Sequence, residues 1–316
     1  MRRREFLLTA AAAPLLRGAA MTSRERMEAA LMGKTADRPP YSLWYHFGLE
    51  AKGPEAHAKA TLSFQERFGT DLVKVMSDFP YPKPAGEWWE LKPVPSPFEP
   101  QLKALSLINE GLGNRKHFVE TIFNPWNVAE KLSSKEAVVQ MMREHPQRLI
   151  DALAAIAQSE ANHARKAIDA GASGIFLAIA NAQEGILTPA EYIKFSEPFD
   201  RMVLDAVRMA PINILHLHGD KLHLQPFLKQ WPASVIQYSA HGTGVPVADL
   251  RKRYSGVIMG GVDERSFRTT TEEKFREQAR QARTAAEESF ILAPGCSVPN
   301  DTTDEEIQRF VRAVAS

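Results

Sequence analysis

The sequence predicts a single α/β barrel of the (β/α)8 type, and three observations favour this class. The chain has 316 residues, of which 44% are hydrophobic and 24% charged, enough for one large core. Short apolar runs alternate with longer amphipathic segments, the pattern of parallel strands joined by helices. Eight such runs within roughly 250 residues suit a closed parallel barrel better than an open doubly wound sheet.

Periodicity and capping patterns place the elements along the chain. Thr22 and Glu25 form a capping-box pattern that opens a short helix, and Gly33 closes it. The predicted strands are residues 41–45, 72–76, 117–122, 174–179, 212–217, 235–239, 256–259 and 289–292. The later predicted helices are residues 146–170, 189–209, 221–230, 247–254, 271–288 and 303–315. Residues 80–100 fit neither period and are interpreted as a loop or hairpin inserted beside the barrel mouth.

Residues 1–20 have the layout of an export signal. Arginines at positions 2–4 precede an apolar stretch and then small residues, which is the order of a signal peptide. The arginines and the Phe6-Leu7 pair resemble a twin-arginine signal, which predicts export to the periplasm, with residues 21–316 as the barrel domain. The apolar stretch is too short for a permanent membrane anchor. If Met21 is instead the true start, the protein is cytoplasmic.

The charge balance and the cysteine content exclude some classes of binding partner and an internal disulfide bond. With 39 basic and 38 acidic residues, the chain has no net field to attract nucleic acid or an anionic membrane. No GxGxxG or GxxxxGK[ST] run follows a predicted strand, which argues against a dinucleotide or P-loop site. Cys296 is the only cysteine, so it cannot form an internal disulfide and must pack, react or bind a metal.

Two predicted strands end in ligands for a soft metal. His216 and His218 stand two residues apart at the end of residues 212–217, so their imidazoles share one face of the strand. Cys296 follows the last predicted strand. Two imidazoles and a thiolate suit zinc and leave one position open for chemistry. The alternative is two polar residues at a strand end and a cysteine that only packs.

Polar residues also end the other predicted strands, where a barrel places its active site. These residues are His46, Asp78, Asn124, Asn181, His241 and Asp263. We expect Asp78 and His241 to orient a small-molecule substrate. We expect the substrate to contact His46, Asn124 and Asp263. Structural alternatives exist, since Asp78 can cap a turn and His46 can pack in the core.

Four motifs of the chain together carry a resemblance to a known family. They are Ala36-Asp37-Arg38-Pro39-Pro40, Ser77-Asp78, Met259-Gly260-Gly261-Val262-Asp263 and Ala293-Pro294-Gly295-Cys296-Ser297-Val298-Pro299. These motifs are similar to those of the uroporphyrinogen decarboxylase superfamily, and the resemblance covers nearly all of residues 22–316. It implies the same (β/α)8 barrel. The superfamily also contains zinc-dependent methyltransferases that act with corrinoid proteins.

The two branches of the superfamily differ in residues that this chain can be matched to. True uroporphyrinogen decarboxylases follow the Arg-Pro-Pro segment with an arginine-rich stretch, which neutralises a substrate bearing eight carboxylates. Residues 41–50 contain no arginine, although Asp78 matches the aspartate that holds the pyrrole N–H groups. The methyltransferases bind zinc through a His-x-Cys pair after the fifth strand and a Cys after the eighth. His216-x-His218 and Cys296 match these places, with one thiolate exchanged for an imidazole.

The resemblance therefore favours a zinc-dependent, methyltransferase-like enzyme acting on a small substrate, with a corrinoid entering only through a partner protein. The exchange of thiolate for imidazole makes the metal a stronger Lewis acid, which favours an oxygen or water ligand over a thiol. One alternative is a metal-free decarboxylase in which Asp78 holds the substrate. Another is an exported protein that binds a metal or a tetrapyrrole-like ligand without turnover.

Overall fold

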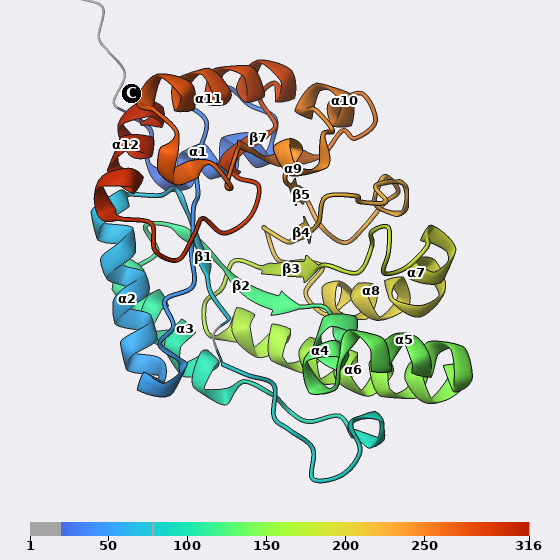
Figure 1. The fold of residues 1–316 in the computed structure, drawn as a ribbon. Helices are drawn as coiled ribbons and strands as arrows, with labels where there is room; N and C mark the ends of the chain where they lie inside the picture. Colours follow the sequence, from blue (N-terminus) through green and yellow to red (C-terminus); the bar gives the residue numbers. More distant parts are fainter. Residues whose placement is uncertain (1–19, 78, 316) are drawn as a thin grey trace, which may run out of the picture.

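A computed structural model describes residues 20–77 and 79–315, and its centre is one parallel sheet (Figure 1). The strands are β1 (Leu72–Val75), β2 (His117–Phe123), β3 (Ile175–Ile179), β4 (Ile214–Leu217), β5 (Val235–Tyr238), β6 (Val257–Val262) and β7 (Phe290–Pro294). Neighbours in the chain are neighbours in the sheet, and each pair is parallel. This curled sheet confirms the predicted α/β barrel class.

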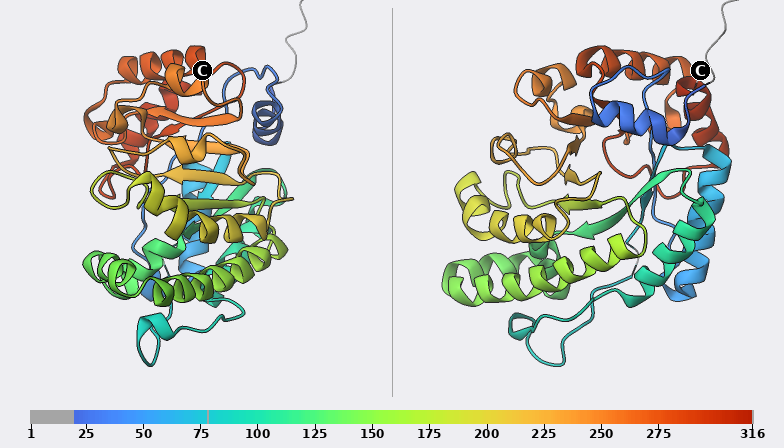
Figure 2. Two further views of the ribbon diagram at one scale, coloured as in Figure 1. Left: turned by 90° about the vertical axis from the view of Figure 1, so that its right-hand side faces the viewer. Right: turned by 180° about the vertical axis from the view of Figure 1, so that it is seen from behind.

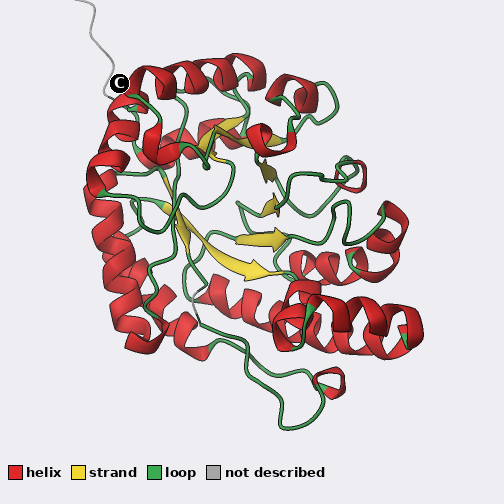
Figure 3. Ribbon diagram, viewed as in Figure 1, coloured by secondary structure: helices red, strands yellow, loops and turns green. Residues whose placement is uncertain are grey.

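Helices surround the sheet on its outer side (Figures 2 and 3). They are α1 (Ser23–Leu31), α2 (Gly53–Phe68), α3 (Glu99–Leu112), α4 (Pro125–Leu132), α5 (Lys135–Glu144), α6 (Pro146–Asp169), α7 (Pro189–Phe195), α8 (Glu197–Asp205), α9 (Ala240–Thr243), α10 (Val247–Arg251), α11 (Glu272–Ala286) and α12 (Asp304–Val314). Short 3-10 turns occur at η1 (Glu50–Lys52), η2 (Trp88–Glu90), η3 (Gln225–Phe227) and η4 (Phe267–Thr269). The capping box predicted at Thr22 and Glu25 begins α1.

The first predicted strand is reduced to a closing segment beside β7. Tyr41 forms a single parallel bridge with Leu292; Ser42 N donates to Leu292 O at 3.0 Å, and Leu292 N donates to Pro40 O at 2.8 Å. On the other side, Asp71 N donates to Tyr41 O at 2.8 Å. Residues 40–42 therefore close the curled sheet between β7 and β1, where an eighth strand of a barrel would stand.

A buried carboxylate anchors this closing segment where the strands begin. Asp71 is fully buried, accepts a hydrogen bond from Tyr41 N at 3.0 Å, and pairs with Arg38 at 2.5 Å and with Arg26 at 3.3 Å. Two guanidiniums and one backbone amide thus compensate the cost of removing the carboxylate from water. The motif at residues 36–40 acts here, at the barrel end remote from the carboxyl ends of the strands.

The barrel interior is filled by a cluster that takes residues from every strand. It includes Leu72, Val119, Phe176, Ile214, Val235, Met259 and Ile291. A larger cluster on the other face of the sheet packs the strands against the helices. Because side chains alternate between the faces of a strand, His216 follows Ile214 into the interior, and Gln237 likewise follows Val235.

Two predicted helices differ from the structure, and a proline explains each difference. Residues 189–209 form α7 and α8, which meet at Ser196, because Pro198 has no N–H to donate to the carbonyl four residues earlier and its ring crowds that carbonyl. Residues 221–230 contain only the short turn η3 around Pro226, so the prediction of a helix there was wrong. Residues 80–100 form a largely irregular excursion that contains η2, as expected.

Two sequence predictions fall on residues that the structure does not describe. The export signal expected over residues 1–20 lies outside the described residues except for Ala20, and Asp78 also lies outside them. Across residues 20–77 and 79–315, no helix has both the length and the apolar character needed to cross a membrane.

Candidate metal centre

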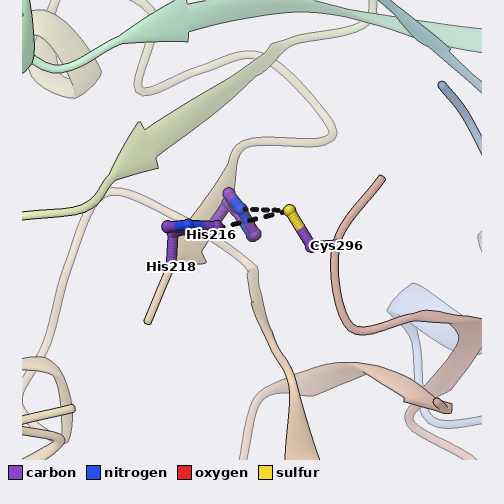
Figure 4. Close-up of side chains that lie close together, drawn as sticks. All are labelled: His216, His218 and Cys296. Atoms are coloured by element: carbon purple, nitrogen blue, oxygen red, sulfur yellow. Dashed lines mark hydrogen bonds between the residues drawn. The ribbon is translucent and has the colours of Figure 1, made fainter. Parts of the chain in front are cut away.

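His216, His218 and Cys296 come together at the carboxyl end of the barrel (Figure 4). His216 lies in β4 and His218 directly follows it, whereas Cys296 follows β7. Strands β5 and β6 separate β4 from β7 in the sheet. The curl of the sheet, rather than strand pairing, therefore brings the cysteine to the two imidazoles.

The distances within this His-His-Cys cluster fit zinc. Cys296 Sγ lies 3.7 Å from His216 Nε2 and 3.4 Å from His218 Nδ1, and the three donor atoms all lie within 4.8 Å of one another. A tetrahedral zinc ion with usual Zn–S and Zn–N lengths holds its sulfur and nitrogen ligands about 3.6 Å apart. The two observed distances lie on either side of that value, so both sulfur–nitrogen edges of the cluster have the length that zinc requires.

Gln237 is hydrogen-bonded both to His216 and to the backbone just before Cys296. It stands opposite His216 in the β4–β5 ladder, and its Oε1 is hydrogen-bonded to His216 Nδ1. Its Nε2 donates to Pro294 O at 2.9 Å and to Gly295 O at 2.8 Å. Carbonyl oxygens only accept, so the amide has one orientation and His216 Nδ1 must carry the proton. Nε2 is thereby the ring nitrogen of His216 that faces the cluster, an arrangement typical of metal-binding histidines.

Electrostatics favour a thiolate at Cys296. Burial acting alone would raise the pKa of the Cys296 thiol, but hydrogen bonds and charge from His216 and His218 lower it to about 4. The hydrogen bond to Cys296 in turn raises the pKa of His218. The cysteine therefore offers a deprotonated sulfur at neutral pH, which is the form that binds metals.

A cavity of about 410 Å³ opens beside the cluster. Its walls include all three ligands and the apolar side chains of Trp44, Met76, Phe123, Phe176, Ala178 and Ala180. The charged side chains on its walls are Lys74, Lys131, Lys135 and Glu130. At this volume the cavity is at the lower end of the range for sites of drug-sized ligands, about 300–1,000 Å³. Its volume therefore suits a small molecule.

A second cavity, of about 730 Å³, borders the same cluster from elsewhere on the rim. His218, Cys296 and Ser297 line both cavities. The other walls of the second cavity are mainly polar, with Asp220, Ser239, Glu264 and Arg265 among them. The cluster is thus accessible from two spaces of different character.

The remaining predicted site residues have different surroundings. His46 lines the first cavity, and its amide donates to Asn300 Oδ1 at 3.1 Å. Asp263 accepts hydrogen bonds from Arg265 N at 3.0 Å and Ser266 Oγ at 2.6 Å, and His241 lies 3.3 Å from Gly261 O. Neither Asp263 nor His241 is among the residues that line the two cavities.

Asn124 lies beneath the cavity and not on its wall. It is fully buried and caps α4 by accepting a hydrogen bond from Asn127 N. Its amide also donates to Asn181, Ser196 and Asp200. With its polar atoms occupied in this way, Asn124 joins α4 to the residues around Asp200, and its expected contact with substrate stays a prediction.

The sequence reasoning missed Gln237 and the lysines of the cavity wall. Gln237 had a readable signal, because it is the one polar side chain in the apolar run of β5. Lys131 and Lys135 had none. They lie on α4 and α5, two helices that the periodicity did not predict, and exposed lysines on helices usually face solvent.

The fold and the cluster together define an α/β barrel protein with a candidate metal centre at its carboxyl rim. The family model for uroporphyrinogen decarboxylase (URO-D) matches residues 80–316, so the chain belongs to this family. A uroporphyrinogen decarboxylase from Synechococcus sp. (strain CC9605) is 30% identical over 157 residues, which cover 47% of this chain and 40% of that protein. The chain thus aligns with less than half the length of this relative.

Two solved structures share the fold. A methyltransferase from Methanosarcina mazei superposes with a TM-score of 0.77 at 19% identity, covering 93% of this chain and 98% of that chain. A B12-independent methionine synthase from Shewanella sp. W3-18-1, in complex with selenomethionine, superposes with a TM-score of 0.58 at 12% identity, covering 88% and 91%. At these identities the likeness shows the barrel fold alone.

Proposed function

We propose that this chain is a zinc-dependent methyltransferase-like enzyme of the uroporphyrinogen decarboxylase superfamily, acting on a small substrate. The observation that carries the proposal is the cluster of His216, His218 and Cys296, whose two sulfur–nitrogen distances match those of a zinc tetrahedron. Three protein ligands leave a fourth position for substrate, as catalytic zinc sites do. The likeness of the fold to a methyltransferase supports the same class.

The residues of the chain have distinct roles in this proposal. His216, His218 and Cys296 hold the metal, and Gln237 keeps the His216 ring in the tautomer that binds it. The apolar walls at Trp44 and Phe176 exclude water from the cavity. When bound, zinc would lower the pKa of a substrate thiol, hydroxyl or water in the open position. The single thiolate leaves the centre less negative than a two-cysteine set, which favours an oxygen ligand.

Metal analysis of the purified protein tests the centre. We expect about one zinc per chain, and we expect His218→Ala and Cys296→Ser to lower this content sharply. His223→Ala is a matched control, because that imidazole bonds Leu187 O at 3.0 Å and takes no part in the cluster. Full zinc occupancy in both ligand variants would contradict the proposed centre. The zinc-loaded protein is then assayed for transfer of an isotope-labelled methyl group between a methyl-corrinoid donor and thiol or hydroxyl acceptors.

A second candidate, a metal-free decarboxylase, is favoured by the likeness to the uroporphyrinogen decarboxylase from Synechococcus. Two observations weigh against it. The cavity is small for a tetrapyrrole, and no arginine is among the described residues that line it. Eight substrate carboxylates would then lose water without enough cationic partners. Conversion of uroporphyrinogen to coproporphyrinogen by the purified protein, abolished by Asp78→Asn, would reverse this ranking.

A further inference from the structure

The first cavity presents more cations than carboxylates to a ligand. Lys74, Lys131 and Lys135 line it, whereas Glu130 is the carboxylate among its described lining residues. Both oxygens of Glu130 accept hydrogen bonds, from Trp126 Nε1 at 2.9 Å and Asn127 Nδ2 at 3.0 Å. The cavity wall is therefore electropositive on the side formed by α4 and α5.

Two of these lysines lie together at the corner between α4 and α5. Lys131 is in the last turn of α4, and Lys135 is the first residue of α5. Within the described part of the chain neither ammonium forms an ion pair, in contrast to Lys103, Lys166 and Lys229. The Lys131 ammonium lies over the ring of Phe123, 3.1 Å from its centroid. The two cations are thus available to an anion that enters the cavity.

The surroundings of Lys131 leave its charge uncompensated. Although the residue as a whole is exposed, burial of its ammonium lowers the pKa of Lys131 to about 8. Glu160 is the acid whose charge acts on Lys131. Glu160 is itself fully buried, neither of its carboxyl oxygens has a hydrogen-bond partner in the described structure, and burial raises its pKa well above the usual range. Because burial disfavours the charged form of Glu160, this acid is a poor counterion for the lysine.

We propose that Lys131 and Lys135 hold an anionic oxygen group of the substrate, so that the enzyme acts on small organic anions. The inference rests on the proposed metal centre, because one end of the substrate meets the lysines while the other reaches the His-His-Cys cluster. The apolar wall between these ends, with Phe123 and Phe176, suits an uncharged carbon spacer. Lysines also suit a carboxylate whose exact orientation differs among substrates, because an ammonium acts as a point charge.

Three small thiols of different charge test the proposal on the cobalt-substituted protein. Binding of a thiolate to Co²⁺ changes its absorption spectrum, so affinity is read without turnover. We expect 3-mercaptopropionate to bind at least tenfold more tightly than 2-mercaptoethanol, and cysteamine to bind most weakly. Lys131→Met and Lys135→Met should each weaken 3-mercaptopropionate about tenfold and leave 2-mercaptoethanol unchanged, because a charge-assisted contact is lost.

Lys194→Met is the matched control, since Lys194 also lies over an aromatic ring, that of Phe195, but on α7 and away from the cavity. Equal affinity for the three thiols, or unchanged affinity for 3-mercaptopropionate in both cavity variants, would overturn the proposal while the metal centre stands. If the chain takes up no cobalt, the metal centre fails instead. Calorimetric titration of the metal-free protein with 3-mercaptopropionate then decides the lysine inference. Binding that is lost in Lys131→Met supports it, and no binding overturns it.

Discussion

Replacement of Gln237 by leucine should weaken zinc binding without touching a ligand. The change removes the acceptor for His216 Nδ1–H and the donor to the carbonyls of Pro294 and Gly295. Leucine has a similar volume, so no large cavity forms. Three hydrogen bonds at about 1 kcal/mol each predict a loss of about 3 kcal/mol in unfolding free energy. Loss of the partner that orients a metal-binding histidine predicts a 10- to 100-fold weaker zinc affinity, on the order of 1.4–2.7 kcal/mol.

Two measurements check this prediction. Competition with a chromophoric chelator gives the zinc affinity directly. Chemical denaturation with and without zinc gives the stabilisation by the metal, which should fall by the same amount as the binding free energy. Gln278→Leu is the control, because Gln278 is also buried but lies on α11, outside the cluster. A chelator midpoint in Gln237→Leu equal to that of wild type would refute the role given to this residue.

Gln237→Glu separates the two functions of the side chain. A carboxylate still accepts the hydrogen bond from His216, so zinc affinity should stay within about tenfold of wild type. It cannot donate to the two carbonyls and is repelled by them, so the metal-free protein should unfold more easily. Equal losses of zinc affinity in the leucine and glutamate variants would show that the orientation of His216 is not what Gln237 contributes.

Four further expectations concern stability, pH and location. Asp71→Ala should lower the unfolding free energy by about 3–5 kcal/mol, because it leaves two arginines without their buried partner, while zinc content stays unchanged. In metal-free protein, alkylation of Cys296 should keep a nearly constant rate from pH 8 to pH 5 and fall near pH 4, as the thiolate takes up a proton. The ratio of the affinities for 3-mercaptopropionate and 2-mercaptoethanol should fall as pH rises through about 8, since Lys131 then loses its charge while the thiol proton is released in both cases; a flat ratio contradicts that role. Residues 1–20 should export a folded reporter, and lysines in place of the arginine pair should retain it inside the cell.

The barrel and the His-His-Cys cluster were readable from the sequence because both depend on simple periodicities. A strand alternates its side chains, so His216 and His218 had to share a face, and a parallel barrel brings the carboxyl ends of its strands to one rim. The sequence implied that the end of β7 approaches the end of β4 only through the assumption that the sheet closes into a barrel. Asn124 illustrates the limit of such reasoning, because a polar residue at a strand end can equally cap the next helix, and sequence position does not distinguish the two.

The sequence could not predict the surroundings of side chains on helices that the periodicity had not identified. α4 and α5 are short helices between β2 and α6, and they place Lys131 and Lys135 over the cavity. Their lysines look like ordinary surface residues in the sequence. The hydrogen bond between Gln237 and His216 depends on the strand register that places the two residues directly opposite each other. Only the paired strands reveal this register.

The closing segment links the His-His-Cys cluster to the join between residues 40–42 and β7. Tyr41 meets β7 at one bridge, and beyond it Val298 N donates to Trp44 O at 3.0 Å, so the two strands of chain continue side by side into the cavity wall. Cys296 lies on one of these strands, between Leu292 and Val298. A transient separation of the two would carry the thiolate away from both imidazoles at once. The lifetime of the bound metal would then depend on how often the two segments separate. Hydrogen exchange of the Ser42 and Val298 amides would occur at the same rate as zinc release.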